Sequence, residues 1–270
     1  AFGPAEHLYV LKTKALQLDP ELIILGLHLG NDFQDAYRTV SSFPYWASFQ
    51  TDSMPPYETA DAAEFSPRDI DEPVGGERVL LLRNWLRRNS MLFRIVEEGP
   101  LGQRINAWGD QQDGFGRNGC VATTTEPFST VFNPQHSFHQ LNPDTVQVGE
   151  GVGLTLLFLK EMADIAAKND IGFLVVFIPT KESVLVGSID ENGTECEVVL
   201  RKVVETEKRL GDRVRRFLQQ HNIDYVDSLE ALRAAASQSR VYIRSVDTHP
   251  SEEGYRVIAE QLVSATQSKP

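Results

Sequence analysis

Apolar positions at the start of the chain follow two different patterns. Between Pro4 and Leu16 they recur every three or four residues, whereas Leu22–Leu29 is one continuous apolar run. The first pattern predicts an amphipathic helix, which Asp19-Pro20 ends. An apolar run without a polar face is typical of a central parallel strand that helices cover on both sides. We therefore expect a helix followed by a buried strand.

The second half of the chain repeats this alternation of helices and short apolar strands. The expected elements are helix 152–168, strand 173–178, helix 198–220, strand 224–226, helix 229–236 and a last helix over 252–265. This order predicts an α/β fold with a mainly parallel sheet. Ligands of such sheets bind at the carboxyl ends of the strands.

Two long segments show no sustained periodicity. Residues 41–78 are rich in Pro, Ser, Asp and Glu, and residues 99–149 in Gly, Asn, Gln and Thr. We interpret both as irregular insertions in a single domain spanning residues 1–270. Between them, the sequence RVLLLRNWLRRNSMLFRIVEE (Arg78–Glu98) predicts a basic amphipathic helix, and we favour packing over membrane binding for its apolar face.

Charge and hydropathy exclude two classes of partner. The 270 residues include 26 Lys and Arg and 38 Asp and Glu, a formal net charge of −12. Such an acidic chain is unsuited to a phosphate backbone, so we expect no nucleic-acid partner. No stretch approaches the roughly 20 apolar residues of a membrane-spanning helix, so we expect no transmembrane segment.

The cysteines and other small sequence patterns point to no cofactor. Cys120 and Cys196 are the only cysteines, and they lack the spacing of a zinc site or a disulfide framework. A single bridge between them stays open. We interpret Asn192-Gly193-Thr194 as a turn, and we expect neither a metal nor a cofactor.

Two short polar segments carry candidate chemistry. Gly30-Asn31-Asp32 follows the first apolar run, and Asp247 and His249 precede the last helix. Each alone is typical of a turn or a capped loop. Together they suit hydrolysis: a carboxylate near a histidine can bond Nδ1–H and leave Nε2 as a base. An amide at a strand end can donate to an oxyanion.

In this order and spacing, the segments resemble the SGNH (GDSL-like) hydrolase superfamily, in its bacterial esterase and acyltransferase-like branch. LGND matches the third block of that family and DTHPSEEG the fifth, while PELIILGLHLGNDF, RNWLRRNSMLFRIV, GFLVVFIPTKESV and IDYVDSLEALR look like the intervening segments. The resemblance implies a three-layer α/β/α, flavodoxin-like fold. It also implies His249 as general base, Asp247 as its orienting partner and Asn31 as an oxyanion donor. Gly30 and Asp32 would be structural residues of the turn.

The nucleophile of the family is missing from the sequence. No Gly-Asp-Ser occurs, and Asp52-Ser53 and Asp227-Ser228 lack both the glycine and the position. The chain starts at Ala1 in AFGPAEHL, where Gly3 resembles the tail of the family's second block. We therefore expect the first strand, the serine and a second oxyanion donor to lie upstream, and these 270 residues alone to be inactive. A signal lost with that segment would make the protein exported or periplasmic.

The function that the resemblance implies is hydrolysis of an acyl ester, either a carbohydrate O-acyl group or a lipid ester. An O-acyltransferase and a non-catalytic carbohydrate-binding or scaffold domain of the same fold remain alternatives. The substrate and the oligomeric state stay open, because both depend on variable surface loops.

A metal-dependent phosphoesterase is the third alternative, with Asp32, Asp247 and His249 as ligands. His136 and His139 form the one close histidine pair, in a segment that we interpret as irregular. Lys181 follows a strand, and we interpret it as a solvated loop residue outside the catalytic set.

Overall fold

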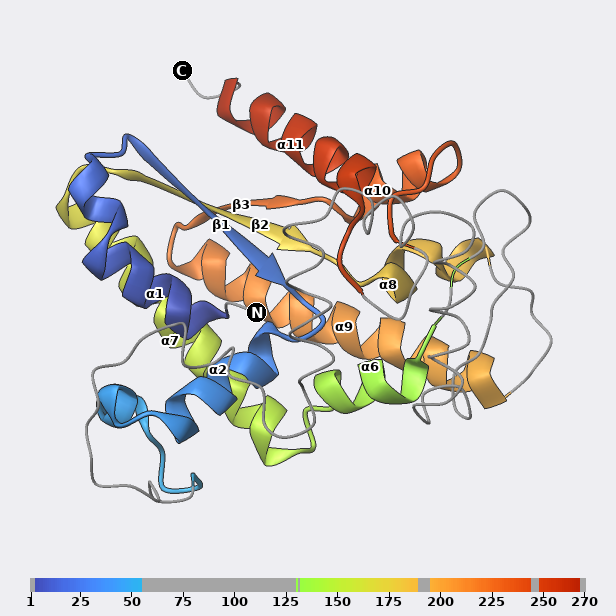
Figure 1. Cartoon of the computed structure of the whole chain (residues 1–270), viewed down its shortest axis with the longest axis horizontal. Coiled ribbons are helices and arrows are strands. Elements are labelled where there is room, and N and C mark those ends of the chain that lie inside the picture. The colour runs from blue at the N-terminus through green and yellow to red at the C-terminus, as the bar shows by residue number, and fades with distance from the viewer. Residues whose placement is uncertain (1–2, 55–129, 131, 189–194, 244–247, 268–270) are drawn as a thin grey trace, which may run out of the picture. The chain divides into compact units, whose positions relative to one another are not determined.

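A parallel sheet with strand order β1-β2-β3 lies at the centre of the part of the chain that is described (Figure 1). The computed structural model describes residues 3–54, 130, 132–188, 195–243 and 248–267, which all belong to one compact unit. β1 (Leu22–His28) runs beside β2 (Gly172–Ile178) from the pair Leu22–Gly172 to the pair His28–Ile178. β3 (Asp224–Asp227) pairs with the other edge of β2. The predicted α/β class with a parallel sheet is confirmed.

Helices make up most of the remaining described chain. The α-helices are α1 (Pro4–Thr13), α2 (Asp32–Ser42), α6 (Pro134–Leu141), α7 (Val146–Lys168), α8 (Lys181–Leu185), α9 (Glu195–Gln220), α10 (Leu229–Ala236) and α11 (Glu252–Gln267). Short 3-10 helices cover Ala15–Leu18, Pro44–Phe49 and Val186–Ser188. Helices α7 and α9 contact β2 and β3 respectively, and α11 also contacts β3.

Three α-helices, α2, α6 and α8, lie where the sequence predicted none. α2 begins directly after Asn31, with Asp32 and Asp35 in its first turn, where acidic side chains favour a helix start. α6 lies inside the predicted irregular segment 99–149, and the Asn133 side chain accepts a hydrogen bond from the His136 N–H at its start. The interpretation of His136 and His139 as loop residues was therefore wrong. Residues 55–78 and the predicted basic helix 78–98 lie outside the described residues.

β1 occupies an edge of the sheet rather than the predicted central position, as far as the described residues go. It pairs with β2 alone, and Leu22 and Ile24 are 40% and 46% exposed. The apolar run predicted helices on both faces, yet the buried residues of the strand all lie in its second half, at Leu25, Leu27 and His28. The pattern therefore gave the burial of the carboxyl end correctly and that of the amino end wrongly.

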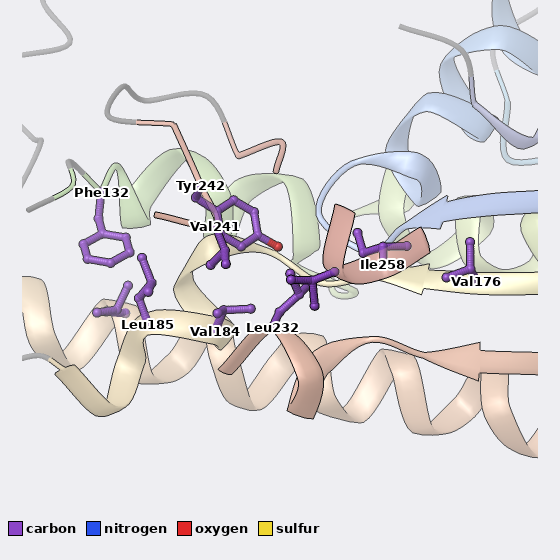
Figure 2. Packing of buried hydrophobic residues seen from close by; sticks show 10 residues of the cluster. Phe132, Val176, Val184, Leu185, Leu232, Val241, Tyr242 and Ile258 are labelled. Carbon is purple, nitrogen blue, oxygen red and sulfur yellow. The ribbon is translucent and has the colours of Figure 1, made fainter. Parts of the chain in front are cut away.

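A cluster of buried apolar side chains lies at the carboxyl end of β2 (Figure 2). Val176 of β2, Val184 and Leu185 of α8 and Leu232 of α10 belong to it, together with Phe132, Leu200, Val241, Tyr242, Val257 and Ile258. Burying one such side chain contributes about 1.5–3 kcal/mol. The cluster therefore stabilises the segments after β2 and β3 where they lead toward the site described below.

Cys196, in the first turn of α9, is disulfide-bonded. The only other cysteine of the sequence, Cys120, lies outside the described residues. Disulfides persist in oxidising compartments and are rare in the reducing cytosol.

The backbones of α2 and α7 touch at Gly151. A Cβ atom built there would lie 1.9 Å from the carbonyl oxygen of Phe33, in the first turn of α2. Two residues further along α7, a Cβ atom on Gly153 would meet nothing within 4 Å. Only the first of these glycines is therefore required by packing.

We expect Gly151→Ala to destabilise the protein by about 1–3 kcal/mol, because the methyl group forces two helix backbones apart. Gly153→Ala is the matched control on the same helix, and it should stabilise the protein by about 0.5–1 kcal/mol, since alanine is the better helix former. Urea unfolding of both variants beside the wild type measures the difference. Equal effects of the two substitutions would contradict the close contact at Gly151.

Candidate functional site

The turn after β1 is closed by a buried carboxylate. Asp32, 3% exposed, accepts a hydrogen bond from the backbone N–H of His28 at 2.8 Å. The N–H of Leu29 still bonds the carbonyl of Ile178, at 3.0 Å, so the strand pairing reaches the turn itself. The end of β1, its turn and the first turn of α2 therefore form one connected unit.

The imidazole of His28 contacts both predicted site segments. Its Nδ1 lies 2.6 Å from Oδ1 of Asn31, and its Nε2 lies 3.3 Å from the carbonyl oxygen of Thr248. The ring also stacks on that of His249, with centroids 4.7 Å apart and planes inclined by 19°. Residues distant in sequence thus meet at the carboxyl end of β1 through one side chain.

Gly30 makes room for this arrangement. A Cβ atom at this position would lie 2.7 Å from Cε1 of His28 and 2.9 Å from Cγ2 of Thr180. Both distances are far below van der Waals contact, so any other residue would displace the imidazole or the chain after β2. Only glycine fits at position 30 without moving His28 or Thr180.

Asn31 is oriented by a carboxylate on the other side. Its Nδ2 donates to Oδ2 of Asp35 at 2.7 Å, and Asp35 also pairs with Arg38 at 3.0 Å. Burial raises the pKa of Asp35, while Arg38, the Asn31 hydrogen bond and His249 oppose that shift. A carboxylate oxygen accepts the amide N–H, which fixes the Asn31 oxygen toward His28.

The loop that carries His249 is tied to the rest of the sheet end. Tyr242 forms an antiparallel bridge with Pro250, and the N–H of Ser251 bonds the carbonyl of Val241 at 2.9 Å. The Tyr242 hydroxyl donates to the carbonyl of Pro179, just after β2, at 2.6 Å. His249 is therefore held close to the ends of β1 and β2.

A second buried polar group follows β2. Glu207 of α9 accepts from the backbone N–H of Thr180 at 3.0 Å and from the hydroxyls of Thr180 and Ser183, and burial raises its pKa. Lys181, between these residues, is 0% exposed. Its interpretation as a solvated loop residue was wrong, because the segment begins the buried helix α8.

The structure brings together two of the three predicted catalytic residues. Asn31 and His249 meet through His28, whereas Asp247 lies outside the described residues. Sequence reasoning missed His28 altogether. The available signal was a histidine in the last position of an otherwise apolar strand, where a buried polar side chain needs a partner.

Searches for relatives leave the family open: no family model matches the chain, and no curated protein matches it significantly. Within the described ranges, no helix is long and apolar enough to cross a membrane. The same residues contain no group of three or more His, Cys, Asp or Glu side chains placed to hold a metal ion. Because Asp247 lies outside them, the metal-dependent alternative stays a prediction.

The buried carboxyl of Asp32 gives a test of the turn. Burial raises its pKa well above 3.8, against the opposing hydrogen bond from His28 N–H, and the charges of Asp35 and Glu6 raise it further. A carboxyl whose folded-state pKa is raised binds protons more tightly in the folded protein, so its contribution to stability falls as pH rises above the unfolded value.

We therefore expect Asp32→Asn to gain stability relative to the wild type as pH rises from about 5 to about 8. The amide oxygen can still accept the His28 N–H, but it carries no charge. Urea unfolding at both pH values measures the difference. Glu230→Gln, at an exposed carboxylate of α10, is the matched control for the substitution itself. A gap between Asp32→Asn and wild type that stays constant with pH would contradict a buried, proton-binding Asp32.

Proposed function

We propose that the protein is an ester hydrolase of the SGNH type, with His249 as general base, Asp247 as its orienting partner and Asn31 as an oxyanion donor. The observation that carries this proposal is the single imidazole of His28, which contacts Asn31 on one side and the His249 segment on the other. A base and an oxyanion donor must lie within reach of one reacting carbonyl.

The hydrogen bonds of Asn31 suit an oxyanion donor. A side-chain amide has two N–H groups, and one of them donates to Asp35. No described residue accepts from the second, which is left to bond a substrate oxygen. Donors held in advance by other groups stabilise developing negative charge without reorganising during the reaction.

The architecture supports the same family. The parallel strands follow the order β1-β2-β3, and in Figure 1 α11 lies on one side of them and α9 on the other. We propose that these elements belong to a three-layer α/β/α fold. Its ligand crevice would lie at the carboxyl ends of the strands, where His28, Asn31 and His249 meet.

The reaction we propose has two steps. A serine attacks the acyl carbonyl while His249 accepts the serine proton, and the alcohol leaves with a proton returned by the imidazole. Water then attacks the acyl-enzyme, with the same histidine as base, and releases the carboxylic acid and the serine. An O-acyltransferase would use a second alcohol in place of that water.

The serine is the part of this mechanism that residues 1–270 do not supply in a Gly-Asp-Ser sequence, and we propose that it lies upstream. The absence of a Gly-Asp-Ser sequence from residues 1–270 also favours the second candidate, a non-catalytic carbohydrate-binding or scaffold domain of this fold. The disulfide at Cys196 agrees with an exported protein in either case.

Labelling with a fluorophosphonate separates the two candidates. For a hydrolase we expect the 270-residue chain to remain unlabelled and a protein extended upstream to be labelled at one serine, mapped by mass spectrometry. His249→Ala should abolish labelling, whereas His139→Ala, at an exposed histidine of α6, should not. An extended protein without a reactive serine would favour the binding domain. A labelled serine within residues 1–270 would refute the upstream assignment.

In the same extended protein, we expect Asn31→Ala to lower kcat by roughly 10²–10³ with little change in KM, because the oxyanion exists only along the reaction path. Hydrolysis of short nitrophenyl esters provides the assay. Asn142→Ala, at a helix cap remote from β1 in the sequence, is the control. A change confined to KM would make Asn31 a binding residue instead.

A further inference from the structure

Both ring nitrogens of His28 face hydrogen-bond acceptors. The Oδ1 atom of Asn31 can only accept, and its orientation follows from the N–H that Asn31 donates to Asp35. The carbonyl oxygen of Thr248 near Nε2 also only accepts. A neutral imidazole has one N–H and can satisfy one of these two contacts, whereas an imidazolium has two and satisfies both.

The acidic groups near the two histidines favour one positive charge. The interaction of Asp35 with His249 favours that charge on either ring, and the two acceptors at the ring nitrogens of His28 assign it to His28. Asp32 bonds the His28 backbone, and Asp35 holds Asn31. Glu6 of α1 accepts a hydrogen bond from the Thr39 hydroxyl of α2, and it interacts electrostatically with both aspartates. Glu207 of α9 accepts a hydrogen bond from the backbone N–H of Thr180, just after β2. Among these acidic residues, Asp35 forms an ion pair with Arg38, the one cationic residue of α2.

The stacking with His249 limits the number of positive charges to one. Two imidazolium rings with centroids 4.7 Å apart would repel each other, and the energy of two unit charges at such a distance is about 1 kcal/mol even in water. A protonated His28 therefore disfavours protonation of His249. A general base must be neutral before it accepts a proton.

We propose that His28 carries the positive charge of this histidine pair and so keeps His249 neutral and in place, as a positioning residue of the active site. This role rests on the proposed function, because it assigns His249 as the base. In this role His28 acts on His249 in two ways. Its charge favours the neutral form of His249, and its contact with Thr248 holds the loop on which His249 lies.

Imidazole nitrogen shifts test the charge distribution in the unmodified 270-residue chain. Long-range ¹H–¹⁵N NMR spectra distinguish imidazolium from both neutral tautomers. Near neutral pH we expect His28 to be protonated at both nitrogens and His249 to be neutral. A neutral His28 at that pH would overturn the inference, whether or not any variant folds. The hydrolase proposal would still stand, because serine labelling decides it.

The substitution His28→Gln tests whether the two rings are coupled. Glutamine keeps an amide that can bond Asn31 but carries no charge, so we expect the pKa of His249 to rise by about one pH unit. His221→Gln replaces a histidine next to the start of β3 and should leave the titration of His249 unchanged. An unchanged titration in a folded His28→Gln variant would refute the coupling. An equal shift in the His221 control would do the same.

Discussion

The hydrogen bond from the backbone N–H of His28 to the buried carboxylate of Asp32 is the contact on which the site depends. It turns the chain from β1 into α2 within a few residues, and it fixes the backbone of the residue whose imidazole contacts Asn31 and His249. Without an acceptor, a buried N–H costs about 1–3 kcal/mol. One hydrogen bond thus satisfies the backbone at the end of β1 and also positions the side chains of the candidate site.

Around this turn the protein gathers acidic side chains whose burial favours their protonated, uncharged forms. Glu6, Asp32 and Asp35 are buried close together, and burial raises the pKa of each. Strongly perturbed pKa values of this kind are typical of functional sites. A cationic imidazole at the buried His28 would favour the charged forms of these carboxyl groups. The positive charge that we assign to His28 therefore suits the three acidic residues near it.

The sequence predicted the fold class and the elements α7, β2, α9, β3, α10 and α11, because these have clear periodicity, but it missed α6 and α8. The predicted helix 229–236 has the observed bounds, and the strand 173–178 differs by one residue. α2 escaped prediction because its polar residues follow the strand directly and are interpreted as a turn. The exposure of Leu22 and Ile24 could not be read from their apolar character. Asn31 and His249 were identifiable as candidates from chemical type. His28 was missed despite its place in an apolar strand, because the role that we propose for it comes from contacts with residues distant in sequence.

The contact between Gly151 and the Phe33 carbonyl has a consequence for how this protein can diverge. Phe33 lies in the same helical turn as Asp32 and Asp35, so any side chain at position 151 would move the acidic residues beside the site. Evolution should therefore retain this glycine as strictly as a catalytic residue, although it has no functional group. If position 151 is always glycine in homologous sequences, the reason would be the close packing of two helix backbones rather than a chemical role of the residue.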